Sequence, residues 1–451
     1  MSGPLVVSKS NPRYFADSTG RVVYLTGSHT WENLQDCGIH DPPPAFDFEG
    51  YLAMLEQHGH NFIRLWTWEQ AAWFASSRER YVIAPLPYQR TGPGTALDGK
   101  PKFDLTRWNP EYFDRLRSRV VAAGERGIYV SVMLFQGWSI MKKDLGGRKK
   151  HLPGNPWPGH PFNRKNNVNG IDGDANGNGE GEEIHTLTVP AVTRLQEAYI
   201  RKVVDTVNDL DNVLYEVSNE SQPESKDWQY HIINYVHQYE ATKPKQHPVG
   251  MSAFYAGREG SMDALYASPA EWIAPQTEGG RYRYDSDPPA ADGRKVIISD
   301  TDHFGIGGDN KWFWKTFTRG MNPIYMDPVT NPGQIAKAPS IETLESARRA
   351  MGQTRRYAER MRLVAMSPRE ELASTRYCLA DENQEYLVYQ PEEGEFKVRL
   401  GGSAADRFSL VWFDPTSGKE IAGGTVKGGG RVEFKSPFPG ACVLWLRRTE
   451  S

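Results

Sequence analysis

Cysteine is scarce in this sequence. The three cysteines, Cys37, Cys378 and Cys442, are too few and too widely spaced for a disulfide scaffold or a cysteine-ligated zinc site. Cys378 and Cys442 both fall in a strand-rich C-terminal region, where one bridge is conceivable, but we expect buried free thiols. The fold must then be stabilised mainly by its hydrophobic cores.

Long apolar runs and a large excess of one charge are also missing. No stretch is long enough to span a bilayer, and residues 1–5 lack the basic and apolar regions of a signal peptide. The net charge of -3 shows no basic footprint for nucleic acid. We therefore expect no membrane and no nucleic-acid partner. The protein would be cytoplasmic, or secreted or periplasmic if a signal peptide has been removed, and its oligomeric state is left open.

Length and aromatic side chains, in contrast, are abundant. A chain of 451 residues is too long for one ordinary core, which favours two domains or one large barrel followed by a smaller module. The 13 tryptophans are a heavy load for the cores alone. Their flat faces suit stacking on sugars, although packing in a core is the default for any single tryptophan.

Eight short apolar segments alternate with helical patterns along residues 1–370. The predicted strands are 22–29, 61–68, 128–135, 212–219, 249–252, 272–275, 295–300 and 323–327, and the predicted helices are 48–58, 112–126, 192–210, 227–239 and 340–362. Residues 69–107 and 142–183, rich in Gly and Pro, are expected to form active-site or mobile loops. The alternation predicts the α/β class and a (β/α)8 TIM barrel. A doubly wound sheet would alternate similarly, but the first strand lacks a Gly-rich phosphate loop.

The hydrophobic period changes to two from about Leu372. Alternating segments occur at 377–380, 385–389, 396–400, 408–413, 431–434 and 442–446. Turn signals at 414–418 and 428–430 separate them. The sequence therefore predicts a C-terminal all-β sandwich domain over residues 371–451.

Carboxylates follow two of the predicted barrel strands. The apolar run 213–217 ends in Ser218-Asn219-Glu220, and a later strand ends in Asp300-Thr301-Asp302. In a parallel β/α barrel, chemistry is placed at the C-terminal ends of the strands. Glycoside hydrolysis needs one protonated carboxyl to release the leaving oxygen and one ionised carboxyl to attack or assist. The plain alternative is a strand that ends in a solvated loop.

These residues resemble the catalytic set of the clan A glycoside hydrolases. Arg64, Asn219-Glu220 and Asp300 fall where that clan carries its arginine, its Asn-Glu acid/base and its nucleophile, and the resemblance covers about residues 22–362. It implies an enzyme that cleaves O-glycosidic bonds of an oligo- or polysaccharide with a pair of carboxylates.

A narrower resemblance is to the apiosidase-type hydrolases. In those proteins a barrel is followed by a small β domain that carries a collagen-binding label, and residues 377–447 are similar to that domain. The label itself rests on similarity, so we do not carry collagen binding over to this chain.

The second carboxylate departs from the clan pattern. The clan usually has Glu on this strand, whereas the chain has Asp300, with Asp302 two residues on. Either aspartate could face the centre, or a water could separate the carboxylates in an inverting mechanism. We expect Asp300 and a retaining mechanism. Arg64 in an apolar run needs a carboxylate partner, and Glu216 is expected to supply it.

Further polar and aromatic residues lie on or just beyond the predicted strands. The candidate substrate contacts, besides Arg64 and Asn219, are His29, Trp31, Trp66, Trp68, Gln136, Trp138, Tyr255 and His303. Trp312 and Trp314 are additional candidate sugar platforms. For each residue, the alternative is a packed side chain without contact to a ligand.

One loop matches a calcium-binding pattern. Its candidate ligands are Asp172, Asp174, Asn176, Asn178 and Glu183, spaced as in Asp-x-Asp-x-Asn-Gly-x5-Glu. The hard oxygen ligands and the glycine suit Ca2+, although helices of an EF-hand do not flank the loop. We expect no cofactor for catalysis and a structural Ca2+ here, with a flexible acidic loop as the alternative.

Two other classes of function fit the same sequence. A carbohydrate-binding protein on a degenerate barrel would use the tryptophans without turnover, and Asp300 in place of Glu keeps this reading open. An adhesion protein would instead act through the C-terminal domain. Glu220→Gln separates the first from an enzyme, because it should abolish turnover and leave affinity nearly unchanged.

Overall fold

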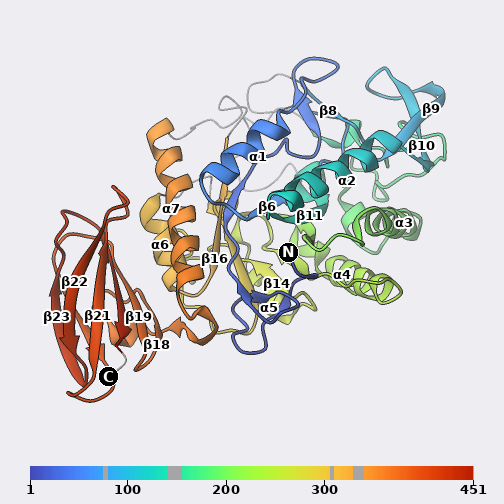
Figure 1. Ribbon diagram of the computed structural model, residues 1–451. Coiled ribbons are helices and arrows are strands. Elements are labelled where there is room, and N and C mark those ends of the chain that lie inside the picture. Colours follow the sequence, from blue (N-terminus) through green and yellow to red (C-terminus); the bar gives the residue numbers. More distant parts are fainter. Residues whose placement is uncertain (75–79, 141–154, 305–308, 329–339, 450–451) are drawn as a thin grey trace.

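The computed structural model describes residues 1–74, 80–140, 155–304, 309–328 and 340–449. Figure 1 shows a barrel of strands surrounded by helices, with a separate stack of antiparallel strands beside α6 and α7. The first part carries the predicted catalytic residues, and the second corresponds to the predicted β-sandwich. The domain boundary at 370/371 stays a prediction.

The barrel is one parallel sheet of eight strands. Its strands, in spatial order, are β4 (Gly27–His29), β16 (Asn322–Met326), β15 (Val296–Asp300), β14 (Trp272–Ala274), β13 (Val249–Ser252), β12 (Val213–Asn219), β11 (Tyr129–Gln136) and β6 (Phe62–Leu65). β4 also contacts β6, so the two edges of the sheet meet. Each strand lies within or next to a predicted segment, and the predicted TIM barrel is confirmed.

Helices cover the outside of the barrel. They are α1 (Phe48–Gln57), α2 (Pro110–Glu125), α3 (Pro190–Val207), α4 (Lys226–Glu240), α5 (Ser261–Ala267), α6 (Asn310–Thr318) and α7 (Ile341–Arg360). On α3, the buried face includes Tyr199 and Val203, as their spacing predicts, whereas Leu195, expected on the same face, is only partly buried. Asp47 and Ser340 cap α1 and α7 by accepting backbone N–H groups of their first turns. The sequence pattern did not predict α5 and α6, since each is under ten residues long.

The prediction that residues 69–107 form only loop is wrong. This region contains β7 (Ala72–Phe74), β8 (Arg80–Ala84), β9 (Tyr88–Thr95) and β10 (Pro101–Trp108); β8 also pairs with β5 (Asp36–Gly38). The sequence pattern did not indicate these strands because Pro and Gly interrupt β9 and because most residues in its C-terminal half are exposed, so that apolar and polar residues do not alternate. A further small sheet joins β1 (Val6–Val7), β2 (Phe15–Ala16) and β3 (Val22–Val23).

The second predicted loop, 142–183, is described only from residue 155. It contains the short 3-10 helices η3 (Trp157–Gly159) and η4 (Glu182–His185). Trp157 and Ile184 are buried in the same cluster, and a side chain at Gly181 would collide with the Trp157 ring. The described part is thus packed against the barrel. The other 3-10 helices are η1 (Gly137–Ile140), η5 (Pro223–Ser225), η6 (Tyr255–Gly257), η7 (Thr301–Phe304), η8 (Leu363–Ala365) and η9 (Glu370–Leu372).

The C-terminal region is all antiparallel β. One sheet has the order β17 (Ser367–Pro368), β18 (Cys378–Asp381), β19 (Glu385–Gln390), β24 (Cys442–Arg448), β21 (Arg407–Phe413) and β22 (Glu420–Lys427), and β20 (Glu395–Leu400) pairs with β23 (Gly430–Lys435). We call this region the β domain. The pattern missed β22, which is largely exposed and contains two consecutive glycines.

The barrel and the β domain share an aromatic cluster. Trp314 of α6 and Tyr357 of α7 lie 5.7 and 5.3 Å, between ring centroids, from Phe413 of β21. Trp445 of β24 lies 5.6 Å from Tyr357. Trp314 is fully buried here, so the prediction that it offers a platform to a sugar is wrong. Trp312 is also buried, and its indole N–H donates to the Tyr284 carbonyl.

The three cysteines are free and buried, as expected. Cys378 pairs across β18 and β19 with Val388, whereas Cys442 lies opposite Gln390, so the two thiols are on different strand pairs. In the described part of the chain, no helix has the length and apolar character needed to cross a membrane.

Candidate active site

The predicted catalytic residues converge at the C-terminal ends of the barrel strands. His29 ends β4, Asn219 ends β12 and Asp300 ends β15, while Gln136 at the end of β11 pairs in register with Asn219. Arg64 lies deeper, because it is in register with Ser131, five residues before the end of β11. The barrel therefore presents one ring of polar side chains above a single buried guanidinium.

Arg64 is the centre of this network and is fully buried. Its Nε and one terminal nitrogen bind both oxygens of Glu216, at 2.8 and 2.6 Å. The same terminal nitrogen reaches Asn219 Oδ1 at 2.8 Å, and the other reaches Asp300 Oδ2 at 2.6 Å. The expected pairing with Glu216 is confirmed, and Ser252, which the sequence did not indicate, donates to the same carboxylate. All three guanidinium nitrogens of Arg64 therefore bind at least one acceptor.

Asp300 is fully buried between His29 and Arg64. Nε2 of His29 lies 2.9 Å from Oδ1 and 2.8 Å from Oδ2, and Arg64 binds Oδ2. Burial alone would raise the pKa of Asp300, but His29 and Arg64 outweigh it and hold that pKa well below its usual range. The backbone N–H of Asp302 also donates to Oδ1, at 2.9 Å. Asp300 is thus ionised at neutral pH.

Glu220 has the opposite environment. It is 5 % exposed, and its backbone is left-handed, with φ of 46°, which turns the side chain away from the strand direction. Burial raises the pKa of Glu220 to about 7, although the indole N–H of Trp138, 2.8 Å from Oε2, and the charge of Arg64 oppose the rise. A carboxyl with such a pKa can exist in either state near neutral pH.

Asp302 lies next to both acids. Burial raises its pKa well above the usual range, and the charges of Glu220 and Asp300 add to the rise. Its Oδ2 is buried without a hydrogen-bond partner among the described residues, and lies 3.9 Å from Arg64. A protonated Asp302 would have one O–H to donate.

The remaining candidate contacts surround these acids. The His29 and Trp66 rings are stacked at 5.6 Å, Trp31 lies near Trp66 and Trp68, and Trp138 meets Tyr255 edge-on at 5.2 Å. Trp66 and Trp68 are 1 % and 3 % exposed, so they pack behind the polar residues of the site and do not present an exposed ring face to a ligand.

His303 and Gln136 hold Asn219 from the other side. His303 Nε2 lies 3.3 Å from Asn219 Oδ1, and burial lowers the pKa of His303 to about 4, which leaves the ring neutral. Gln136 Oε1 accepts from the Asn219 amide at 3.4 Å and from the Trp138 backbone at 3.2 Å. Substrate contact by any of these residues stays a prediction.

Besides Ser252, two residues near the site were not predicted from the sequence. Gln276 follows β14 and donates to the His303 carbonyl at 2.7 Å, and Glu69 accepts from the Gln136 backbone at 2.9 Å. Gln276 could have been found as a polar residue just beyond a predicted strand. Glu69 could not, since its partners His160 and His185 lie about a hundred residues away in sequence.

The predicted calcium loop is held by its own hydrogen bonds. Glu183 accepts the Asn176 N–H at 3.0 Å, Asp174 accepts that of Gly179 at 2.8 Å, and Asn176 accepts that of Asn178 at 2.8 Å. Asp172 accepts the Asp174 N–H at 3.3 Å. Among the residues that the structure describes, no group of three or more His, Cys, Asp or Glu side chains is arranged to hold a metal. Calcium at this loop stays a prediction.

Two family models match parts of the chain. One, described as "Domain of unknown function (DUF6298)", matches residues 81–265. The other, described as "Putative collagen-binding domain of a collagenase", matches residues 365–442. The second match agrees with the resemblance of the β domain noted above, while the apiosidase-type likeness stays a prediction. No protein of curated function matches by sequence.

Solved structures match the chain over nearly its whole length. A protein named "Glycoside hydrolase" has a TM-score of 0.62, with 99% of this chain and 97% of that chain covered. A glycoside hydrolase family 5 protein from Bacteroides vulgatus has 0.61, with 99% and 94% covered, and a "putative glycoside hydrolase" from the same organism has 0.64, with 99% and 82%. All three are 13% identical to this chain. At this identity the likeness shows the fold, a TIM barrel followed by a β domain.

Proposed function

We propose that the protein is a glycoside hydrolase that cleaves O-glycosidic bonds of an oligo- or polysaccharide with retention of configuration. The observation that carries this is the contrast between two neighbouring buried carboxyls, Glu220 with a pKa near 7 and Asp300 with a pKa held low by His29 and Arg64. Environments that push two such pKa values apart define an acid and a partner that stays ionised. The same barrel architecture in solved glycoside hydrolases supports the assignment.

In the first step, protonated Glu220 gives its proton to the glycosidic oxygen as the bond to the anomeric carbon breaks. An oxygen of ionised Asp300 bonds to that carbon and gives a glycosyl ester. In the second step, Glu220 takes a proton from a water whose oxygen attacks the anomeric carbon and releases Asp300. The Trp138 N–H keeps the Glu220 carboxyl oriented in both steps.

The neighbours of the two acids have matching roles. Arg64 and His29 position Asp300 and favour its ionised form. Asn219, held by Arg64, is placed to bind the sugar 2-hydroxyl, a contact that strengthens in the transition state. Protonated Asp302 would donate a hydrogen bond to another hydroxyl, and Trp138 with Tyr255 would bound the sugar ring.

Asp302 is a second candidate for the reacting carboxylate. Its Oδ2 makes no hydrogen bond in the described structure, whereas both oxygens of Asp300 are already bound. Attack by Asp302 would require that it first lose its proton. In an inverting mechanism, a water would instead lie between the two carboxyl groups and attack the sugar, and such groups are about 6.5–9.5 Å apart. The anomer formed first, read by proton NMR, separates retention from inversion.

A screen with nitrophenyl glycosides and plant or microbial polysaccharides tests the proposal. Turnover by the wild type and a loss of at least ~1,000-fold in Glu220→Gln, with binding retained, are expected. Asp300→Asn should lose as much, and Asp302→Asn less. Binding without turnover in the wild type would instead establish the carbohydrate-binding alternative.

A further inference from the structure

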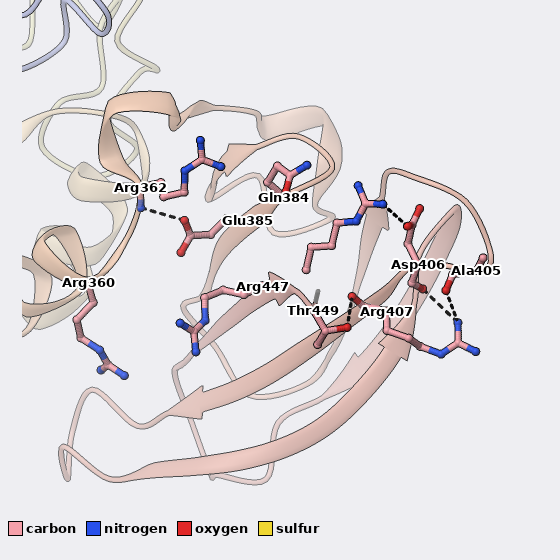
Figure 2. A pocket seen from close by; sticks show the side chains of 10 residues that line it. Arg360, Arg362, Gln384, Glu385, Ala405, Asp406, Arg407, Arg447 and Thr449 are labelled. Atoms are coloured by element: carbon pink, nitrogen blue, oxygen red, sulfur yellow. Dashed lines mark hydrogen bonds and ion pairs between the residues drawn. The ribbon is translucent and has the colours of Figure 1, made fainter. Parts of the chain in front are cut away.

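A hollow lies in the β domain, where it meets the end of α7. It has a volume of about 590 Å3 and is lined by five arginines, Arg360, Arg362, Arg407, Arg447 and Arg448. We call it the arginine pocket. Figure 2 shows Arg360 and Arg362 entering from the segment that ends α7, Arg447 from a strand of the β domain, and Arg407 at the far end.

The positive charge of this pocket is only partly neutralised within it. Its lining contains two acids, Glu385 and Asp406, against the five arginines. Asp406 binds Arg448. Glu385 is 4 % exposed and accepts from the Trp445 indole at 2.8 Å and from a backbone N–H at 3.0 Å, so its oxygens point inward. A dissolved anion would therefore meet arginines more than carboxylates.

Three arginines of the pocket have carboxylate partners. Arg448 has Asp406, Arg360 binds Glu420 at 2.5 Å and Arg362 lies 3.3 Å from Asp381. The other two arginines of the pocket, Arg407 and Arg447, are held in a different way.

The other two arginines are fixed without a carboxylate. Arg407 donates to backbone carbonyls of the preceding loop, the first at 2.9 Å from Ala404. Arg447 stacks on the Trp445 ring with 4.3 Å between guanidinium and ring centroid. In the described residues neither has a carboxylate within ion-pair distance. Such guanidinium groups are held in place yet keep donors for planar anionic groups.

We propose that the arginine pocket binds an acidic polysaccharide, that is, a sugar chain that carries carboxylate or sulfate groups. The inference rests on the proposed function, which makes a carbohydrate the natural partner. The guanidinium fork matches both anionic groups, and the volume lies in the range of ligand sites, about 300–1,000 Å3. Trp445 is 2 % exposed, so recognition is ionic rather than by stacking on a sugar face.

The arginine pocket lies far from the catalytic residues. α7 follows β16 and runs back antiparallel to it, so its end at Arg360 lies at the barrel end opposite the strand ends that carry Glu220 (Figure 1). The pocket is therefore separate from the proposed active site. It would tether a long acidic chain, and its loss should affect binding of polymer but not turnover of short glycosides.

Affinity electrophoresis of the full chain tests this directly. Gels that contain polygalacturonate or dextran sulfate should retard the wild type, and this retardation should decrease as the salt concentration rises. Gels that contain neutral dextran should not retard it. Arg407→Gln/Arg447→Gln should weaken the retardation at least ~10-fold. The control Arg164→Gln/Lys165→Gln removes the same charge from exposed residues elsewhere and should leave it unchanged. Arg447→Lys keeps the charge without the fork and should fall between.

Equal weakening in both double variants, or equal retardation by neutral dextran, would overturn the proposal. Equal affinity for a single-stranded DNA oligonucleotide would also overturn it, because the pocket would then bind any polyanion. Nitrophenyl glycoside turnover is measured in parallel and should be unchanged in Arg407→Gln/Arg447→Gln. If no glycoside is turned over but the arginine-dependent retardation persists, the proposed function fails while the binding site stands.

Discussion

At the scale of single residues, one guanidinium decides the state of several acids. Arg64 in an apolar strand is costly to bury unless its charge is matched, and the sequence alone therefore required a carboxylate partner. Glu216 could be expected, four residues before Glu220 on the same strand. The His29 contact to Asp300 could not, because it joins the first and seventh strands of the barrel and depends on its closure.

Removal of this guanidinium should destabilise the protein strongly. Arg64→Met leaves Glu216 and Asp300 buried without their cation, and the free energy of unfolding should fall by roughly 3–5 kcal/mol. Urea unfolding followed by tryptophan fluorescence measures the change. Arg64→Met/Glu216→Gln, which removes one of the stranded charges, should recover part of the loss, and equal stability of the two variants would contradict the account.

The raised pKa of Glu220 predicts a pH-dependent stability. Because its folded pKa of about 7 exceeds the unfolded value near 4.5, the folded state binds more protons between these values, and the free energy of unfolding falls as pH rises through that window. Glu220→Gln removes this loss, so the variant should exceed the wild type by up to roughly 3 kcal/mol at pH 8 and by little at pH 4.5.

Thermal unfolding of both proteins at the two pH values measures the difference. Asp300 acts in the opposite direction, since its lowered pKa gives stability above its unfolded pKa that is lost as pH falls, but it contributes equally to both proteins. Glu125→Gln on the exposed face of α2 serves as the control. A gain from Glu220→Gln that is the same at both pH values would exclude the proposed cause.

At the scale of elements, strand ends set the positions of the acids. Glu220 and Asn219 are held against Gly137, where a Cβ atom would lie 2.5 Å from the Glu220 carbonyl oxygen and 2.6 Å from that of Asn219. Gly137→Ala must push the end of β12 aside. Since a displacement of about 1 Å can cost ~100-fold in rate, turnover should fall by about that factor while the fold persists.

Glycoside turnover and circular dichroism together check this prediction. Gly430→Ala, with no heavy atom within 4 Å of its added Cβ, is the matched control and should change neither. Full activity in Gly137→Ala would show that the end of β12 does not set the position of Glu220.

The calcium prediction also belongs to an element, the loop from Asp172 to Glu183. If the loop binds Ca2+, addition of calcium to protein freed of metal by a chelator should give a measurable heat of binding, and the melting temperature should rise. Asp174→Asn/Glu183→Gln removes two charged ligands and should abolish both effects. Calorimetry without a signal for the wild type would leave the loop held by its own hydrogen bonds alone.

The elements also show where sequence reasoning reaches its limit. The barrel strands were predictable because they are short apolar runs that are buried on both faces of the sheet, as in 213–217 and 296–299. The strands of 72–108 were not, because exposed faces, Pro and Gly erase the alternation there. The sequence indicated Asp302 as a candidate but could not predict the direction of its side chain. That direction, which leaves Oδ2 without a hydrogen bond, is set by η7, the 3-10 helix that follows the strand.

At the scale of the whole molecule, the β domain is part of the barrel's packing. Trp314 and Tyr357 on two barrel helices contact each other and are buried in one cluster with residues of the β domain, where Phe413 lies against both rings. The arginine pocket is formed by the same contact. The family matches of the two halves are separate, at 81–265 and 365–442, whereas the solved structures contain both.

This shared cluster predicts that the two parts unfold together. Calorimetry of the wild type should give one transition, and Phe413→Ala should destabilise the protein by roughly 3–5 kcal/mol, because it opens a cavity beside the Trp314 and Tyr357 rings. With the coupling weakened, the β domain should melt separately and first. Phe396→Ala, which opens a cavity inside the β domain instead, should lower stability without separating the transitions as far. Two transitions already in the wild type would mean that the aromatic cluster holds the parts side by side without coupling their stability.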